Sequence, residues 1–430
     1  MLLIRGGRVF GALSDTADVL MANGEVVEVS DNIIIGEDMD VIEAGGCVVA
    51  PGLVDMHVHF REPGYEYKED ILSGAAAAAA GGVTTCCCMP NTSPVADNAK
   101  VVRHIVDRAK DAPVRVLPYG AVTIGQEGRE LTDFAALKAA GAVALSDDGN
   151  CIQNAALMYR AMLLAKDLDL LIISHCEDAD MVQNYALNEG KVSWELMLPG
   201  RPAVAEEIMV ARDAMLAAET GARLHIAHVS TARSVDIIRK AKEAGVRITA
   251  ETCPQYFSLT EDEILKQYSI ARVNPPLRTK NDVEAIIDGL SDGTIDVIAT
   301  DHAPHSADEK AKPLVEAPGG MIGLETSLAL ALTFLHHAGH LSIDEIITRM
   351  SVSPTQIINS KLLVDSLSAT VDNKAALMSC EDLIVFDPNE EWTAKPDKFR
   401  SKARNTPFAG MKLRGKVKYT ICKGEVVFSD

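Results

Sequence analysis

The chain contains 430 residues, 47% of them hydrophobic, which is enough for a large core and excludes a largely disordered protein. Its formal net charge is −20 without a basic tract, so general binding to nucleic-acid phosphates is excluded and an anionic substrate needs a local positive site. No apolar stretch is long enough for a membrane span, and Arg5 interrupts an apolar start that is already too short for a signal peptide.

The cysteines predict a reducing environment. There are nine, an odd number without a regular framework, and three of them are adjacent at Cys86, Cys87 and Cys88. Adjacent side chains on a strand face opposite sides, so these three cannot close on one metal ion. We therefore predict small, buried, free thiols in a protein of the cytoplasm.

The first 50 residues predict short strands joined by turns, and "ANGE" at 22–25 is typical of a tight hairpin turn. From Pro51 the pattern changes to short apolar runs, most of them separated by a helical stretch. The eight predicted strands lie within 52–60, 82–91, 114–123, 141–149, 168–178, 222–230, 246–257 and 294–305. The predicted helices lie within 67–82, 98–111, 133–141, 153–167, 205–221, 231–245 and 281–293.

Eight strand–helix repeats indicate an α/β protein with a (β/α)8 TIM-type barrel. The rival is a doubly wound open sheet, which would normally carry a glycine-rich loop after its first strand, and "HFREPG" is not such a loop. Beyond about residue 354 the pattern returns to short strands, and "ICKGEVVF" resembles the N-terminal "MANGEVVEV". We expect residues 1–50 and 355–430 to form one small β-sandwich domain beside a barrel of residues 51–354.

The first barrel strand, "VDMHVHF", carries two histidines one residue apart. Alternate side chains of a strand share a face, so His57, His59 and Asp55 project together. Imidazole is a common zinc ligand, and such a pair can hold one metal ion. This strand alone fits a pair of buried, hydrogen-bonded histidines equally well. Further metal ligands elsewhere in the chain are needed to choose between the two interpretations.

Other strand ends supply those ligands. In a (β/α)8 barrel the chemistry lies at the C-terminal ends of the strands, which converge on one mouth. The strand-end residues of the types that bind metals are Asp147, Asp148, His175, His228, Asp301, His302 and His305. This set is too large for one tetrahedral ion, whereas four histidines and two carboxylates fit two ions. Two ions predict hydrolysis by an activated water. A nearby carboxylate, Asp301, would move the proton.

The motifs "VDMHVHFRE", "MPNTSP", "SDDG", "SHCED", "AHVS", "VNPPLR" and "ATDHAPH", in this order, resemble the class I dihydroorotases of the amidohydrolase superfamily. The resemblance implies that His57, His59 and Asp301 bind one zinc ion, that His175 and His228 bind a second, and that Asp148 bridges them. Strand four offers no lysine in "ALSDDG", which agrees with the class I pattern. Asp147 remains the alternative bridge.

The resemblance also implies a set of substrate-binding residues. Arg61, Asn91 and His305 would hold a carboxylate, with His59 beside them, because a guanidinium matches a carboxylate with two hydrogen bonds. Asn274, Gly319 and Gly320 would contact the ring amides. The alternatives are a surface ion pair of Arg61 with Glu62 or Asp70, and turn-forming roles for the two asparagines. The polar stretch 305–320 is long enough for a moving lid.

The function implied by the resemblance is interconversion of N-carbamoyl-L-aspartate and (S)-dihydroorotate in pyrimidine synthesis. The resemblance also implies a homo-oligomer, such as a dimer. Association with aspartate carbamoyltransferase is a further option. One alternative is another cyclic amidohydrolase of the allantoinase or hydantoinase type. Those substrates have no ring carboxylate, so Arg61 would have no partner. A second is a catalytically silent partner of the carbamoyltransferase, which the full ligand set disfavours. Residues 367–386 depart from the family's usual short turn.

Overall fold

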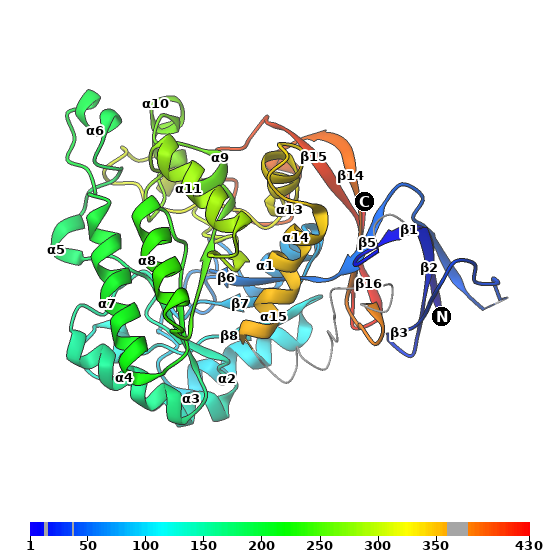
Figure 1. Ribbon diagram of the computed structural model, residues 1–430, viewed down its shortest axis with the longest axis horizontal. Helices are drawn as coiled ribbons and strands as arrows, with labels where there is room; N and C mark the ends of the chain where they lie inside the picture. Colours follow the sequence, from blue (N-terminus) through cyan, green and yellow to red (C-terminus); the bar gives the residue numbers. More distant parts are fainter. Residues whose placement is uncertain (13–15, 37, 359–376) are drawn as a thin grey trace.

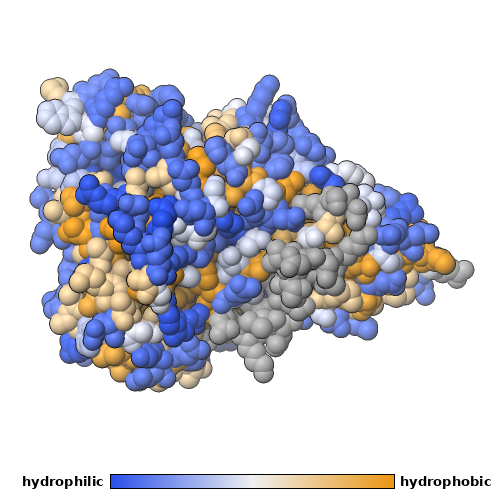
Figure 2. Space-filling view, viewed as in Figure 1, coloured by the Kyte–Doolittle hydropathy of each residue, from blue (hydrophilic) through white to orange (hydrophobic). Residues whose placement is uncertain are grey.

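The computed structural model describes residues 1–12, 16–36, 38–358 and 377–430 as a barrel with a β-sheet unit beside it, and both termini lie in that sheet (Figure 1). Ten residues of the unusual stretch 367–386, namely 367–376, lie outside the described residues. No helix in these ranges is long and apolar enough to cross a membrane. Hydrophilic residues cover much of the face shown in Figure 2.

The barrel consists of two sets of parallel strands. One set is ordered β6 (Leu53–Val58), β7 (Val83–Cys88) and β8 (Arg115–Pro118). The other is β9 (Ala144–Ser146), β10 (Leu171–Ser174), β11 (Leu224–Ile226), β12 (Ile248–Thr252) and β13 (Val297–Ile298). Parallel bridges between Gly120 and Leu145, and between Val58 and His302, join the two sets at both seams. All eight predicted strands and the (β/α)8 fold are therefore confirmed.

The helices between these strands match the seven predicted ones within a few residues. They are α1 (Ile71–Ala80), α2 (Ala99–Arg108), α3 (Phe134–Ala140), α4 (Ala155–Asp167), α7 (Val204–Thr220), α8 (Ala232–Glu243) and α11 (Lys280–Ser291). Several begin where a side chain accepts a backbone N–H, such as Asn98 before α2 and Thr231 before α8. Helix α1 packs closely on Phe60, two residues after the end of β6: a Cβ added at Gly74 would lie 2.4 Å from the Phe60 ring.

Shorter elements complete the barrel. They are α5 (Ala179–Val182), α6 (Lys191–Glu195), α9 (Pro254–Ser258), α10 (Glu263–Gln267), α12 (Ala307–Lys310), α13 (Ser327–Ala331), α14 (Ile343–Ile347), α15 (Ser353–Ile358), the 3-10 turns η1 (Ala109–Asp111), η2 (Ile124–Gln126), η3 (Tyr268–Ala271) and η7 (Pro396–Lys398), and the π-helical turns η4 (Leu332–His336) and η5 (Thr348–Val352). Of these, α12 and η3 lie close to the mouth of the barrel and matter for the site.

Both ends of the chain build one sheet, in the order β16-β15-β14-β5-β1-β2-β3, with β4 on β1. Its strands are β1 (Leu2–Val9), β2 (Thr16–Ala22), β3 (Glu25–Ser30), β4 (Asp40–Glu43), β5 (Val48–Pro51), β14 (Leu383–Thr393), β15 (Lys412–Cys422) and β16 (Glu425–Ser429). The two outer hairpins meet at their turns, since a Cβ on Gly424 would lie 2.3 Å from the Cα of Gly24. The sheet therefore curls back on itself, which confirms the predicted β-sandwich.

One hydrophobic core runs from this sheet into the barrel. It contains Val49 of β5, Leu53 of β6 and Ile384 of β14, all at most 1% exposed. Because β6 follows β5 after a single residue, the strand that carries His57 is anchored to the sheet at its N-terminal end. Eight of the nine cysteines, including Cys86 to Cys88, are buried as predicted.

Candidate active site

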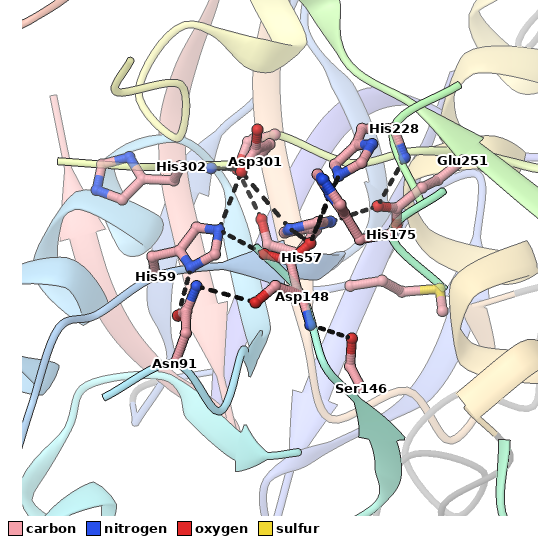
Figure 3. A network of polar contacts seen from close by, with 12 residues as sticks. His57, His59, Asn91, Ser146, Asp148, His175, His228, Glu251, Asp301 and His302 are labelled. Carbon is pink, nitrogen blue, oxygen red and sulfur yellow. Dashed lines mark hydrogen bonds and ion pairs between the residues drawn. The ribbon is translucent and has the colours of Figure 1, made fainter. Parts of the chain in front are cut away.

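Six buried side chains from five barrel strands converge at the C-terminal mouth (Figure 3). His57 lies near the end of β6 and His59 just after it, while the other four follow the ends of β9, β10, β11 and β13. The six residues are His57, His59, Asp148, His175, His228 and Asp301. The structure thus brings together every residue that the sequence analysis proposed as a metal ligand.

Asp148 lies at the centre of this cluster. Its Oδ1 is 3.4 Å from Nε2 of both His57 and His228 and 3.5 Å from His175 Nδ1, while its Oδ2 is 3.5 Å from His59 Nε2. Burial alone would raise the pKa of Asp148, but the charge of His57 and the nearby imidazoles of His175 and His228 hold that pKa well below its usual range. A carboxylate that faces four imidazoles through two oxygens has the arrangement needed to bridge two cations.

Asp301 completes a second group beside the first. Its Oδ1 is 3.1 Å from His59 Nε2 and 3.5 Å from His57 Nε2. Two overlapping triads result, His57–Asp148–His228 and His57–His59–Asp301, and within each triad the ligand atoms lie within 4.8 Å of one another. His57 belongs to both triads.

Two atoms of the cluster have no hydrogen-bond partner. His57 Nε2 and Asp148 Oδ1 are buried and unsatisfied, although they lie 3.4 Å apart. A buried polar atom without a partner costs about 1–3 kcal/mol, and here two such atoms face each other among nitrogen and oxygen donors that suit zinc. The residues present therefore fit a bound metal.

Outer partners orient the imidazoles. His57 Nδ1 lies 2.6 Å from Glu251 Oε1, and His59 Nδ1 lies 2.9 Å from Asn91 Oδ1, so both rings turn Nε2 toward the cluster. His175 faces the opposite way, with Nε2 3.6 Å from a carboxylate oxygen of Glu177 and Nδ1 toward Asp148. If the inner nitrogen of each ring binds a metal, the outer nitrogen carries the proton and donates it to the outer carboxylate or amide oxygen.

Two further residues of the site, Glu251 and Glu177, were not predicted from the sequence. Glu251 lies in β12, the seventh barrel strand, whose two neighbours both supplied ligands, and Glu177 lies within the "SHCED" motif. Glu251 also contacts a second ring, His225, at 3.2 Å. Burial raises the pKa of Glu251, but the charge of His57 and the two imidazole contacts lower it further than burial raises it. An inward carboxylate on a barrel strand between two ligand-bearing strands was the available signal.

Two strand-end residues point elsewhere. Asp147 accepts hydrogen bonds from the backbone N–H groups of Val122 and Thr123 at 2.8 and 3.0 Å and from the Thr123 hydroxyl, so it secures the preceding loop. His302 accepts from the Gly323 N–H at 3.2 Å and approaches Glu69 at 3.5 Å. Of the two adjacent aspartates, Asp148 is therefore the one within the cluster.

The opposite wall of the pocket is cationic. Arg61 donates from Nε to the Pro304 carbonyl at 3.3 Å, and its Nη2 lies 3.4 Å from His305 Nε2. Neither predicted surface partner engages Arg61, because Glu62 accepts from Arg108 and Asp70 from Lys402. The strand β6 ends at Val58 and Arg61 adopts a positive φ of 64°, so it reaches the pocket from a turn and does not continue the alternation of the strand.

The predicted ring-binding residues line the same cavity of about 530 Å³ as the metal-ligand candidates. Asn274 Oδ1 is buried without a hydrogen-bond partner. Gly319 and Gly320 lie against it and against His305: a Cβ on Gly319 would be 2.9 Å from the Asn274 side chain, and one on Gly320 3.1 Å from His305 Nε2. The stretch 305–320, predicted as a lid, forms the helix α12 and a wall of this cavity.

A buried cluster of imidazoles and carboxylates at the mouth of a (β/α)8 barrel, opposite an arginine, is the arrangement of a hydrolase that polarises an amide. The L-hydantoinase (dihydropyrimidinase) of Arthrobacter aurescens has a similar structure, with a TM-score of 0.85 and 25% identity over 100% of this chain and 96% of that chain. The D-hydantoinase of Bacillus sp. AR9 has a TM-score of 0.83 and the same fold. The chain is thus a cyclic amide hydrolase of the amidohydrolase type.

Comparison of sequences is more specific. A family model described as dihydro-orotase-like matches residues 46–234. Dihydroorotases of Acetivibrio thermocellus and Clostridioides difficile are 48% and 46% identical to this chain, covering 100% of it and 99% and 100% of their own lengths. The chain belongs to the dihydroorotase family.

Proposed function

We propose that the chain catalyses the reversible ring closure of N-carbamoyl-L-aspartate to (S)-dihydroorotate and water, in pyrimidine synthesis, with two zinc ions. The observation that carries the proposal is the opposition of two features in one cavity. Imidazoles and carboxylates of the cluster line this cavity, and so does Arg61, whose guanidinium has no carboxylate partner among the described residues. A ring that bears both an amide and a carboxylate matches both sides.

His57, His59 and Asp301 would hold one zinc ion, and His175 and His228 the other, with Asp148 between them. Zinc ions held there would polarise the amide carbonyl and favour deprotonation of water at neutral pH. The unsatisfied His57 Nε2 and Asp148 Oδ1 support this assignment. Removal of metal with a chelator, followed by return of zinc in measured amounts, tests the count of two per chain.

Asp301 is the proposed proton carrier. In the hydrolytic direction its carboxylate accepts a proton from the attacking water and delivers it to the ring nitrogen as the C–N bond breaks; in the direction of ring closure it takes the proton from the ureido nitrogen. Its position at the end of β13, with Oδ1 against His59, supports this role because the other oxygen stays available to the substrate side.

The substrate's groups have matching partners. Arg61 would hold the ring carboxylate, with His59, Asn91 and His305 beside it. His305 stays neutral because burial and the positive charges of Arg61 and two lysines lower its pKa to about 2. Asn274 Oδ1 would accept a ring N–H, which would satisfy the buried oxygen. The main chain at Gly319 and Gly320 would contact a ring carbonyl.

Turnover by the metal-replete protein tests the proposal. We expect efficient hydrolysis of dihydroorotate and little or none of hydantoin or allantoin. Faster turnover of either uncharged ring would favour the hydantoinase or allantoinase alternative, to which the structural similarity points. Absence of turnover on all three, with metal bound, would favour the non-catalytic partner role.

The organisation of the chain is also proposed from the sequence. We place the small β-domain at residues 1–50 and 355–430 and the barrel at 51–354, a homo-dimer as the assembly, and the cytoplasm as the location. The sheet shared by both termini supports the division. Light scattering of the purified chain, alone and mixed with an aspartate carbamoyltransferase, tests the assembly and the predicted association.

A further inference from the structure

Two buried cations lie directly behind the cationic wall of the pocket. Lys310 ends the short helix α12 and is 3% exposed, and Arg272 follows η3 and is 8% exposed. Neither side chain pairs with a carboxylate anywhere in the described part of the chain, although the protein carries a net charge of −20. Lysine and arginine are almost never fully buried without such a partner.

Within the described residues, the side-chain hydrogen bonds of both cations all go to main-chain carbonyls. Lys310 Nζ donates to the carbonyls of Arg272, Pro318 and Gly320 at 3.3, 3.0 and 3.1 Å, which uses its three hydrogens. Arg272 donates from Nη1 to the Leu314 carbonyl at 2.7 Å, while its Nε is buried without a partner. Together the two residues hold both ends of the segment 314–320.

That segment carries the pocket wall. The Gly319 carbonyl accepts from His305 Nε2 at 3.0 Å, and the Gly320 carbonyl accepts from Asn405 as well as from Lys310. Lys310 therefore lies one peptide group behind the surface that faces Arg61. The neutral side chain of Asn405 also donates a hydrogen bond to the Gly320 carbonyl. Satisfying that carbonyl therefore does not require a positive charge at Lys310.

We propose that Lys310, backed by Arg272, is a positioning residue that sets the affinity for the anionic substrate, by holding the Pro318–Gly320 wall and by placing an uncompensated positive charge behind it. The inference rests on the proposed function, because it requires a substrate with a carboxylate. Lys310 does not touch the substrate and acts through the wall and its field.

The charge should be lost within the working pH range. Burial and the neighbouring charge of Arg272 lower the pKa of Lys310 to about 7. The other charged groups around it keep their state from pH 6 to 9: the pKa of Arg272 is about 10, that of His305 about 2, and that of Glu309, which pairs with Lys68, about 2. We expect affinity for the anion to weaken as pH rises through 7.

The test compares Lys310→Met and Lys310→Arg with wild type and with Lys312→Met, a change at an exposed lysine two residues further along the chain. Steady-state kinetics on dihydroorotate and on dihydrouracil, the latter as substrate or as competitive inhibitor, are measured from pH 6 to 9 with the zinc content of each sample. Lys310→Met should raise KM for dihydroorotate about tenfold at pH 6, the size expected for one unscreened charge near a buried anion. KM or the inhibition constant for dihydrouracil should change little, and kcat should stay near wild type.

The pH profiles separate charge from packing. KM for dihydroorotate should rise with pH in wild type and in Lys312→Met, stay high and flat in Lys310→Met, and stay flat in Lys310→Arg. Equal changes for both rings, or a wild-type rise that persists in Lys310→Arg, would overturn the inference; should the Met variant not fold, the Arg variant still decides. Wild-type protein that does not process dihydroorotate would instead refute the proposed function.

Discussion

On the metal-ligand side of the pocket, the reactive side chains leave barrel strands directly and are held by buried carboxylates and amides. On the opposite side, Arg61, His305 and the glycines lie outside the strands, and the buried Lys310 holds the main chain at Pro318 and Gly320. The first construction suits bonds to a metal that tolerate little displacement, and the second suits an anion recognised by field and hydrogen bonds. Substitutions on the metal-ligand side should therefore release the metal. Substitutions on the opposite side should retain the metal and weaken affinity for the anionic substrate.

The largest effect is expected at His57, which belongs to both triads. His57→Ala should release tightly bound zinc and lower turnover by more than about 10³-fold, because the ring supplies a direct bond and the metal supplies the chemistry. Zinc content after dialysis and turnover of dihydroorotate measure this. His104→Ala, an exposed histidine on α2, is the control, and normal zinc and turnover in His57→Ala would refute the assignment.

Next comes Asp301. Asp301→Asn keeps an oxygen near His59 but cannot accept the proton, so kcat should fall about 10²–10⁴-fold while KM changes little. The zinc content of the same sample shows how much of the loss comes from the metal. Asp308→Asn, on the exposed side of α12, should behave as wild type. A near-normal kcat with zinc bound would mean that another group carries the proton.

On the cationic side, Arg61→Met should leave zinc in place and lower kcat/KM for dihydroorotate. Removing one partner of a desolvated charge pair costs about 2–5 kcal/mol of binding free energy. Arg61→Lys should restore part of the loss, since lysine keeps the charge without the planar fork. Dihydrouracil, which has no carboxylate, is the internal comparison, and Arg103→Met on α2 is the control variant. Equal losses on both rings would show that Arg61 supports the site without reading the carboxylate.

The smallest effect is expected at Glu251, which lies outside the cluster of candidate ligands. Glu251 touches no substrate-facing atom but orients His57 at 2.6 Å. Glu251→Gln should weaken zinc binding about 10–100-fold, and excess zinc should restore turnover. Titration of the metal-free protein with zinc gives the affinity directly, with Glu243→Gln on the exposed face of α8 as the control. An unchanged zinc affinity would mean that packing alone orients the ring.

The two sides also differ in how far the sequence predicts them. His57 and His59 could be placed because a strand has a period of two, and the other ligands because parallel strands end at one mouth. Arg61 could be placed in the pocket only through the resemblance, because the strand stops at Val58 and no periodicity describes a turn with φ of 64°. Lys310 lies in "ADEK", which is typical of a solvated helix end, and nothing local signals that it is 3% exposed.

The choice between Asp147 and Asp148 shows the same limit. Adjacent residues point apart, but which one turns inward depends on the N–H groups of Val122 and Thr123, which come from the loop after the preceding strand. Glu251 was missed for a related reason, since its partner His57 lies 194 residues away. Sequence periodicity describes one strand at a time and cannot describe pairing across the barrel.

The shared sheet sets an order of events during synthesis. Strand β5 pairs with β14, and the turn at Gly24 meets the turn at Gly424, so the N-terminal strands have an open edge until β14 and the strands after it have been made. Strand β6 continues from β5, so we expect the first two histidines of the pocket to reach their final positions only after β14 has paired with β5.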